Sequence, residues 1–401
     1  MTISKNIKAI LHKSSWIRRM FEEGARLKKI HGPENVYDFS LGNPNLNPPE
    51  EFMERLKKIV HISGHGDHAY MPNAGYPHVR NSIAAFISKE HQINITGDDI
   101  IMTCGAAGAL NVILKAILDA GDEVITPAPY FVEYGFYVSN HGGILKTAPT
   151  NQDFTLNVKA IADAITKKTR AVIINSPNNP TGQIYSEASL AELGALLKEA
   201  EKKMDTNIYL ISDEPYRKIV YDDFKVPSIF KCCNNSIIAT SYSKDISIPG
   251  ERIGFIAVNP DADHKIDLIE GMTLANRILG FVNAPALMQR VIAEIQGISV
   301  DISGYARKRK LLCEGLADCG YDFITPPGAF YLFPKTPIPD DVEFITELQK
   351  ERILTVPGSG FGGPGHFRIA FCVDDKTIIN SLPGFRRAIE KKRIGDEINY
   401  P

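Results

Sequence analysis

Short apolar runs bounded by turn residues recur through the middle of the chain, between about residues 98 and 260. Seven of these runs have the length and the residue types of β-strands, and most of them end in a small or polar residue. In chain order they are DDIIMT, DEVITPAP, GILKTAP, TRAVIINSP, NIYLISDEP, SIIATSYS and RIGFIAVNP. This pattern predicts a sheet of seven strands.

Helical patterns alternate with several of these runs. In residues 106–120 and 186–203, apolar side chains recur every three or four positions, which is the period of an amphipathic helix. Strands that alternate with helices form a mostly parallel sheet with helices on both faces, and such sheets bind ligands at the carboxyl ends of their strands. We therefore predict an α/β fold and expect the functional residues where the strands stop.

The pattern changes near residue 296. A long helical segment is followed there by GAFYLFPKT, DVEFITELQKERILTVPGSGFG and HFRIAFCVD, in which short strands and helices are mixed. A helix in the first 45 residues cannot bury its apolar face alone, so we expect it to join this C-terminal part. The sequence thus predicts a large domain, residues 46–295, and a smaller α+β domain made of residues 1–45 and 296–401.

Composition narrows the class of protein. Of the 401 residues, 44% are hydrophobic and 23% are charged, and the formal net charge is −2. The basic residues are scattered, and the run RKRK at 307–310 is interpreted as the solvated face of a helix, so we expect no nucleic acid partner. No apolar run approaches the roughly 18 residues that span a bilayer. Charges also interrupt the amino terminus, where a signal peptide needs an apolar core. We expect a cytoplasmic protein without a membrane partner that acts on small molecules.

Cysteine and histidine spacing gives no sign of a metal site. The six cysteines lack paired metal spacing and do not suggest a disulfide framework, which fits a reducing compartment. Glycines interrupt the segment that holds His61, His65 and His68, so we expect these side chains to be solvated or to lie at an interface. We predict no metal.

Three predicted strands end in residues that allow two interpretations each. CGAAGAL, after the first strand, is either a helix amino terminus that binds an anion or a tight turn. Asn179, in SPNNPTGQIYS, either projects over the sheet or belongs to a plain turn. Asp213 ends a very apolar strand, where a carboxylate is costly to bury unless it meets a cationic ligand atom or joins a structural salt bridge.

Lys244 follows the strand SIIATS in a segment that also contains Ser241, Ser243 and Arg252. A lysine among polar anchors at a strand end can act as a Schiff-base amine once its surroundings lower its pKa. A helix amino terminus and an arginine suit a phosphate, a lysine suits an aldehyde, and an aspartate suits a ring nitrogen that must stay protonated. Pyridoxal 5'-phosphate is the ligand that combines all three.

At this point the sequence resembles the class I/II aminotransferases of pyridoxal-phosphate fold type I, over nearly its whole length. Nine motifs of that family occur here in the family's order: SLGNPN, YMPNAGYPHVR, CGAAGAL, PYFVEY, NNPTG, SDEPY, SYSKDISIPGERIG, GAFYLFP and FRIAF. The resemblance implies a homodimer with shared active sites. It also implies that an L-amino acid, with aspartate as the first candidate, gives its amino group to a 2-oxo acid such as 2-oxoglutarate by a ping-pong mechanism.

The resemblance implies roles for individual residues as well. Lys244 would bond to the cofactor aldehyde and then move the proton at the substrate Cα, while Asp213, supported by Tyr134, would pair with the pyridine nitrogen. The other implied cofactor contacts are Ala106, Ala107, Phe131, Asn179, Tyr216, Ser241, Arg252 and, from the neighbouring subunit, Tyr70. The substrate would be held by Gly42, Asn179 and Arg368.

Some features depart from the family pattern and leave alternatives open. Ala107 stands where many relatives carry serine or threonine, and Phe131 replaces the tryptophan of some aspartate-specific members. A distal carboxylate has no assigned arginine, and Arg277 is a candidate only. SKDISIPGERIG also resembles the same stretch of 1-aminocyclopropane-1-carboxylate synthases, so a lyase or cyclising enzyme is the alternative. A cofactor-binding transcription regulator would need a DNA-binding module, which we do not expect in the residues before SLGNPN.

Overall fold

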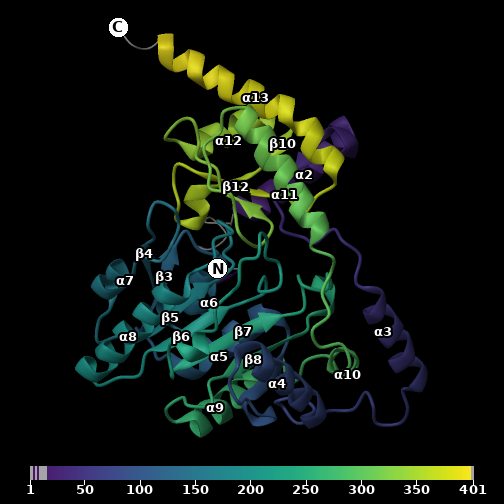
Figure 1. Ribbon diagram of the computed structural model, residues 1–401, viewed down its shortest axis with the longest axis vertical. Helices are drawn as coiled ribbons and strands as arrows, with labels where there is room; N and C mark the ends of the chain where they lie inside the picture. Colours follow the sequence, from purple (N-terminus) through teal and green to yellow (C-terminus); the bar gives the residue numbers. More distant parts are fainter. Residues whose placement is uncertain (1–2, 5–6, 9–15, 399–401) are drawn as a thin grey trace.

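The computed structural model describes residues 3–4, 7–8 and 16–398. Its largest sheet has seven strands in the order β2-β8-β7-β6-β5-β3-β4, low in the view of Figure 1. Every neighbouring pair is parallel except the two pairs that include β8. The predicted fold class, a mostly parallel seven-stranded α/β sheet, is confirmed. The strands are β2 (Ile100–Thr103), β3 (Glu123–Ala128), β4 (Ile144–Pro149), β5 (Thr169–Asn175), β6 (Tyr209–Asp213), β7 (Ser236–Ser241) and β8 (Gly254–Val258).

Helices pack on both faces of this sheet because successive strand residues point to opposite sides. Ile174 of β5 belongs to the apolar cluster of one face, and the adjacent Ile173 belongs to the cluster of the other. The first cluster includes residues of α3 (Glu50–Ile62), α4 (Pro77–His91), α7 (Val158–Ala164), α8 (Glu187–Met204) and α10 (Ala286–Ala293). The second includes residues of α5 (Gly105–Ile117), α6 (Glu133–Asn140) and α9 (Lys265–Ile278). None of the described helices is long and apolar enough to cross a membrane.

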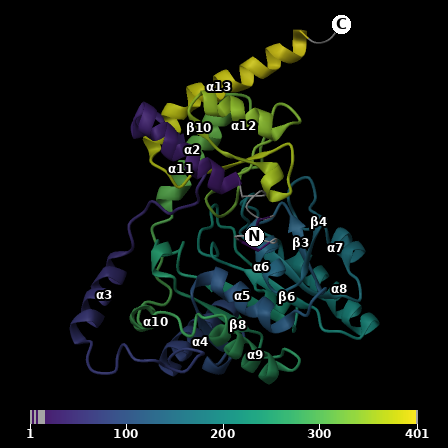
Figure 2. The ribbon, with the colours of Figure 1, turned by 180° about the vertical axis from the view of Figure 1, so that it is seen from behind.

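A third apolar cluster joins the two ends of the chain, and the helices that contribute to it lie in the upper part of Figures 1 and 2. Its helices are α2 (Trp16–His31), α11 (Ser303–Asp318), α12 (Asp341–Lys350) and α13 (Asp375–Ile398). Its strands form a parallel pair, β1 (Tyr37–Asp38) with β10 (Ile353–Leu354), and an antiparallel sheet of β11 (Val356–Pro357), β12 (Phe367–Ala370) and β9 (Tyr331–Leu332). The proposed domain boundaries at residues 45/46 and 295/296 stay a prediction.

Two residues of the basic run 307–310 on helix α11 are buried, not solvated as the sequence had predicted. Lys308 and Arg309 are buried, with only 4% and 9% of their surfaces exposed. The Nζ of Lys308 donates to Oδ1 of Asn45 at 2.9 Å, and Nη2 of Arg309 donates to Oδ2 of Asp222 at 2.6 Å. The prediction of a solvated face was wrong for these two residues, because partners from distant segments allow the helix to bury two cations.

Candidate active site

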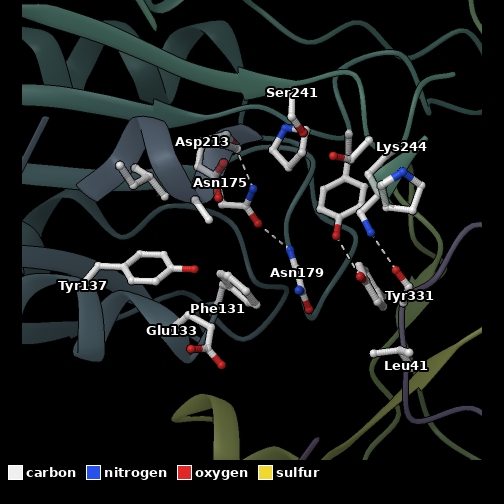
Figure 3. Close-up of a pocket in the computed structure, with 18 of the residues that line it drawn as sticks. Leu41, Phe131, Glu133, Tyr137, Asn175, Asn179, Asp213, Ser241, Lys244 and Tyr331 are labelled. Carbon is white, nitrogen blue, oxygen red and sulfur yellow. Dashed lines mark hydrogen bonds between the residues drawn. The ribbon is translucent and has the colours of Figure 1, made fainter. Parts of the chain in front are cut away.

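A cavity of about 340 Å³ lies where the central strands stop (Figure 3). Asn175 ends β5, Asp213 ends β6, and Ser241 ends β7 with Lys244 just beyond it. Parallel strands that lie side by side end at the same edge of a sheet, so residues far apart in the sequence meet there. The antiparallel sheet of the third cluster also lines the cavity, through Tyr331 on β9 and Arg368 on β12.

Apart from the candidate Arg277, the cavity brings together all of the residues predicted to contact the cofactor or the substrate except Tyr70. Tyr70 does not line it and is 92% exposed, so its predicted contact with a neighbouring subunit stays a prediction. The predicted residues that line it are Gly42, Ala106, Ala107, Phe131, Asn179, Asp213, Tyr216, Ser241, Lys244, Arg252 and Arg368.

Asp213 is a buried carboxylate, and only one of its two oxygens accepts a hydrogen bond from a described residue. Its Oδ2 accepts a hydrogen bond from the Tyr134 hydroxyl at 2.7 Å, as the sequence analysis expected of Tyr134. Its Oδ1 is buried and has no hydrogen-bond partner among the described residues. Burial raises the pKa of Asp213 to about 7, although the bond from Tyr134 opposes that rise. A buried oxygen without a partner in a cavity wall suits a cationic donor, since such a donor would stabilise the charged form.

Lys244 occupies the other side of the cavity (Figure 3). Its Nζ donates to the backbone oxygen of Gly42 at 2.7 Å, and it lies 5.8 Å from the centre of the Phe330 ring. Burial lowers the pKa of Lys244 to about 8, because the buried ammonium loses its hydration. The neutral amine, which is the nucleophilic form, is therefore well populated at mildly alkaline pH.

The amino terminus of α5 forms a cradle that suits an anion. Gly105 begins this helix with a φ of +75°, and a Cβ at that position would lie 2.9 Å from Nη2 of Arg252. Arg252 is held by a 2.7 Å hydrogen bond from Nη1 to the backbone oxygen of Pro249. The first N–H groups of a helix lack partners within it, so small residues here leave the backbone open to a phosphate.

Arg368 on β12 presents a fixed guanidinium to the cavity. Its Nη1 donates to Oδ1 of Asn179 at 2.9 Å, and its Nη2 donates to the backbone oxygen of Ser40 at 2.5 Å. The guanidinium lies 4.8 Å from the ring centres of both Tyr331 and Phe361. Its Nε has no hydrogen-bond partner among the described residues. A planar fork that is held by hydrogen bonds and by two rings can bind both oxygens of a carboxylate.

Four polar residues that line the cavity were not predicted from the sequence: Glu133, Tyr137, Asn175 and Tyr331. The Nδ2 of Asn175 donates to the backbone oxygen of Asp213 at 2.8 Å, and its Oδ1 accepts from the backbone N–H of Asn179 at 2.6 Å. Asn175 therefore connects the end of β6 with the segment that follows β5. A polar residue at the end of the run TRAVIIN was a signal that could have revealed Asn175. Glu133 and Tyr137 are one helical turn apart on α6, next to Phe131 in Figure 3.

Arg277, the candidate for binding a distal carboxylate, does not line this cavity. It is exposed on α9 and borders a separate surface hollow with Asn73 and Leu274. Among the described residues, the arginines and lysines that line the cavity are Lys244, Arg252 and Arg368.

Three of these groups fit the parts of pyridoxal phosphate. The cradle at the start of α5 fits the phosphate, the amine of Lys244 fits the aldehyde, and the unpartnered oxygen of Asp213 fits a protonated ring nitrogen. Arg368 is then left to bind a carboxylate of the substrate.

Solved structures share this architecture. An aminotransferase from Eubacterium rectale superposes with a TM-score of 0.95 at 40% identity, and the match covers 98% of this chain and 99% of that one. An aspartate aminotransferase from Thermus thermophilus, solved with maleate, superposes with a TM-score of 0.85 at 27% identity, covering 97% and 100% of the two chains.

Sequence comparisons agree with the structural ones. A probable aspartate aminotransferase of Methanocaldococcus jannaschii is 31% identical over 86% of this chain and 91% of its own length. A probable aspartate/prephenate aminotransferase of Aquifex aeolicus is 30% identical over 89% of this chain and 92% of its own. The model of the family described as "Aminotransferase class I and II" matches residues 34–382. The chain therefore belongs to the class I and II aminotransferases, a family that depends on pyridoxal phosphate.

Proposed function

We propose that this aminotransferase moves the amino group of an L-amino acid to a 2-oxo acid by a ping-pong mechanism at the cavity described above. The observation that carries the proposal is the convergence of Lys244, Asp213 and Arg368 on one cavity. These residues supply a buried amine, a buried carboxylate and a guanidinium for a carboxylate. Family membership and the names of the relatives support transamination.

Pyridoxal phosphate, when bound, supplies an aldehyde that accepts the amino group and a protonated ring that withdraws electrons from the substrate. We propose that Ser241, Arg252 and the first N–H groups of α5, at Ala106 and Ala107, hold its phosphate. The ring would be held by Asp213 at its nitrogen, by Phe131 at its face, and by Asn179 and Tyr216 at its phenolic oxygen.

The chain's own groups then handle the substrate. Arg368 binds the α-carboxylate, with Gly42 and Asn179 beside it, and so fixes the orientation of the Cα–H bond. Lys244 would hold the aldehyde of the cofactor and, as a free amine, would move the proton at the substrate Cα. Fixing the reacting groups in this way replaces a bimolecular encounter with a positioned transfer, which is a large part of the rate gain.

Aspartate is the first donor to test, because several relatives are named aspartate aminotransferases, and 2-oxoglutarate is the first acceptor. We further propose a homodimer in which Tyr70 completes the neighbouring site. We also propose a cytoplasmic location, which agrees with six cysteines that are all free.

The test is an absorption measurement on the protein loaded with pyridoxal phosphate and mixed with each common amino acid in the absence of any 2-oxo acid. We expect a few donors to replace the visible band of the aldehyde form with the near-ultraviolet band of the amine form. Addition of 2-oxoglutarate should then restore the visible band, and the Lys244→Ala variant should show neither change while keeping the unfolding temperature of the wild type.

The same measurement separates the alternative reactions. A visible band that persists while ammonia or another product accumulates would identify a lyase or a cyclising enzyme that uses the same cofactor. Full amine exchange by the Lys244→Ala variant would overturn the role of Lys244, and a protein that never acquires a visible band would overturn the cofactor assignment.

A further inference from the structure

We propose that Tyr331 is a positioning residue that links the hydroxyl of Tyr216 to the guanidinium of Arg368. Neither the motifs nor the comparisons assign it a role. The inference rests on the proposed function for what Tyr216 and Arg368 bind, and on the geometry of this chain for the link itself.

Tyr331 crosses from one part of the fold to the other. It lies on β9, whose neighbour in the sheet is the strand β12 that carries Arg368. Its side chain is buried and reaches the segment after β6, where its hydroxyl lies 2.7 Å from the hydroxyl of Tyr216. The two rings meet edge to face, with centres 5.5 Å apart. One side chain therefore joins the antiparallel sheet to the segment that follows β6.

Tyr331 also fixes two other groups of the cavity. The guanidinium of Arg368 lies over its ring at 4.8 Å, a cation–π contact that limits tilting of the fork. A Cβ at Gly42 would overlap the Tyr331 hydroxyl, so the backbone at this glycine packs directly against it. The oxygen of Gly42 is in turn the acceptor for Lys244.

The direction of the hydroxyl contact follows from donor counting. A tyrosine hydroxyl donates one hydrogen bond, so Tyr216 can donate to the cofactor's phenolic oxygen only if it accepts from Tyr331. Burial raises the pKa of both tyrosines, that of Tyr331 to about 12, so both keep their protons at neutral pH. A hydroxyl that accepts one hydrogen bond becomes a stronger donor in the next. Tyr331 thus strengthens the donation by Tyr216.

The first test is the Tyr331→Phe variant, which keeps the ring over Arg368 and removes only the hydroxyl. Weaker donation by Tyr216 stabilises the negative phenolic oxygen less, so the bound cofactor loses its proton at higher pH. We expect the pH midpoint of its visible band to rise by about half a unit to one unit, the size of one hydrogen bond. The KM for amino acid substrates should stay within about twofold of the wild type, because the ring contact is intact.

The second test separates the ring from the hydroxyl. Tyr331→Leu removes both, so we expect the same rise in the midpoint together with a KM about tenfold higher, since Arg368 loses one of its two ring contacts. Tyr305→Phe is the control, because Tyr305 is a buried tyrosine that does not line the cavity. It should leave both the midpoint and the KM unchanged.

A double-variant cycle decides whether Tyr331 acts through Tyr216. The midpoint of the Tyr216→Phe, Tyr331→Phe double variant should equal that of Tyr216→Phe alone, because the link has nothing left to act on. Additive shifts, or an unchanged midpoint in Tyr331→Phe when Tyr216→Phe raises it, would overturn the proposal. Loss of the visible band in the wild type would instead indicate failure of the proposed cofactor site itself.

Discussion

At the scale of single residues, burial shifts the chemistry of Lys244 in a direction that can be measured. Its pKa falls from 10.5 to about 8, so the folded chain releases this proton in a pH range where an exposed lysine keeps it. Only the neutral amine can attack an aldehyde. Below pH 8 most Lys244 side chains are charged, and the neutral fraction rises about tenfold per pH unit up to the pKa.

We therefore expect the cofactor-free protein to take up pyridoxal phosphate faster as the pH rises, with a plateau above pH 8. The measurement is the rate of appearance of the visible band between pH 6 and pH 10, and Lys244→Ala, which should show no such band, is the control. A rate that is independent of pH, or one that rises only near pH 10.5, would contradict the lowered pKa.

Glu133 is the charged residue of the cavity that the proposed function assigns to no group of the cofactor or the substrate. It begins α6, lines the cavity and is half-buried, and no hydrogen bond or ion pair joins its carboxylate to another described residue. Burial raises the pKa of Glu133, because the charged carboxylate loses hydration in this position. Its charge therefore opposes an acidic substrate side chain nearby.

We predict that Glu133→Gln raises kcat/KM for aspartate about fivefold relative to kcat/KM for alanine, because one repulsive charge is removed at moderate distance. The measurement is the ratio of kcat/KM values for the two donors. Glu251→Gln, an exposed change that does not touch the cavity, should leave that ratio as in the wild type. An equal effect on both donors would show that Glu133 does not sense the substrate side chain.

At the scale of elements, the end of β6 places two adjacent carboxylates, Asp213 and Glu214, in different surroundings. Asp213 lines the cavity, whereas Glu214 accepts from the hydroxyl of Ser212 at 2.8 Å and from Nη1 of Arg217 at 3.1 Å. The Nε of Arg217 also donates to Oε1 of Glu90 on α4, at 3.0 Å. This buried charge network fixes the end of β6 to a helix that covers the sheet.

Removing the cation from this network should destabilise the whole protein. We expect Arg217→Met to lower the free energy of unfolding by about 3–5 kcal/mol, because Glu214 would remain buried without a cationic partner. Unfolding in urea, followed by circular dichroism, measures the change. Lys310→Met is the matched control, since it breaks an exposed pair with Glu314 and should change the free energy by less than about 1 kcal/mol. A loss of similar size in both variants would contradict the argument.

At the scale of the whole molecule, exposed apolar side chains agree with a second copy of the chain as partner. Tyr70 is 92% exposed, and α9 exposes Ile266, Leu274 and Ile278 to 71%, 48% and 57%. Exposed apolar groups that gather on one element are a common mark of a protein interface. A homodimer would cover such groups and could place Tyr70 at the neighbouring site.

Mixing two inactive variants tests this arrangement. If Tyr70 serves the neighbouring subunit, a heterodimer of Lys244→Ala and Tyr70→Ala chains contains one site with both changes and one with neither. Co-refolded mixtures should then regain about a quarter of the wild-type activity, as random pairing predicts. If Tyr70 serves its own subunit, every site carries a change, and the mixture should be no more active than the Tyr70→Ala protein it contains.

The sequence by itself determined the order of the seven strands along the chain and the positions where each of them stops. Apolar periodicity and turn residues are local signals, so they place Lys244, Asp213 and Asn179 at strand ends without any information from distant segments. The family motifs added Arg368, which lies on a short strand that shows little chemistry of its own.

Only the tertiary structure decided which groups face one another. The contact of Tyr331 with Tyr216 joins residues 115 positions apart, and the burial of Lys308 depends on Asn45, which is 263 positions away. In the same way, Glu133 lines the cavity only because of the way α6 packs on the sheet. A local pattern fixes the face of an element on which a residue lies, but burial and partners depend on distant segments that the pattern does not specify.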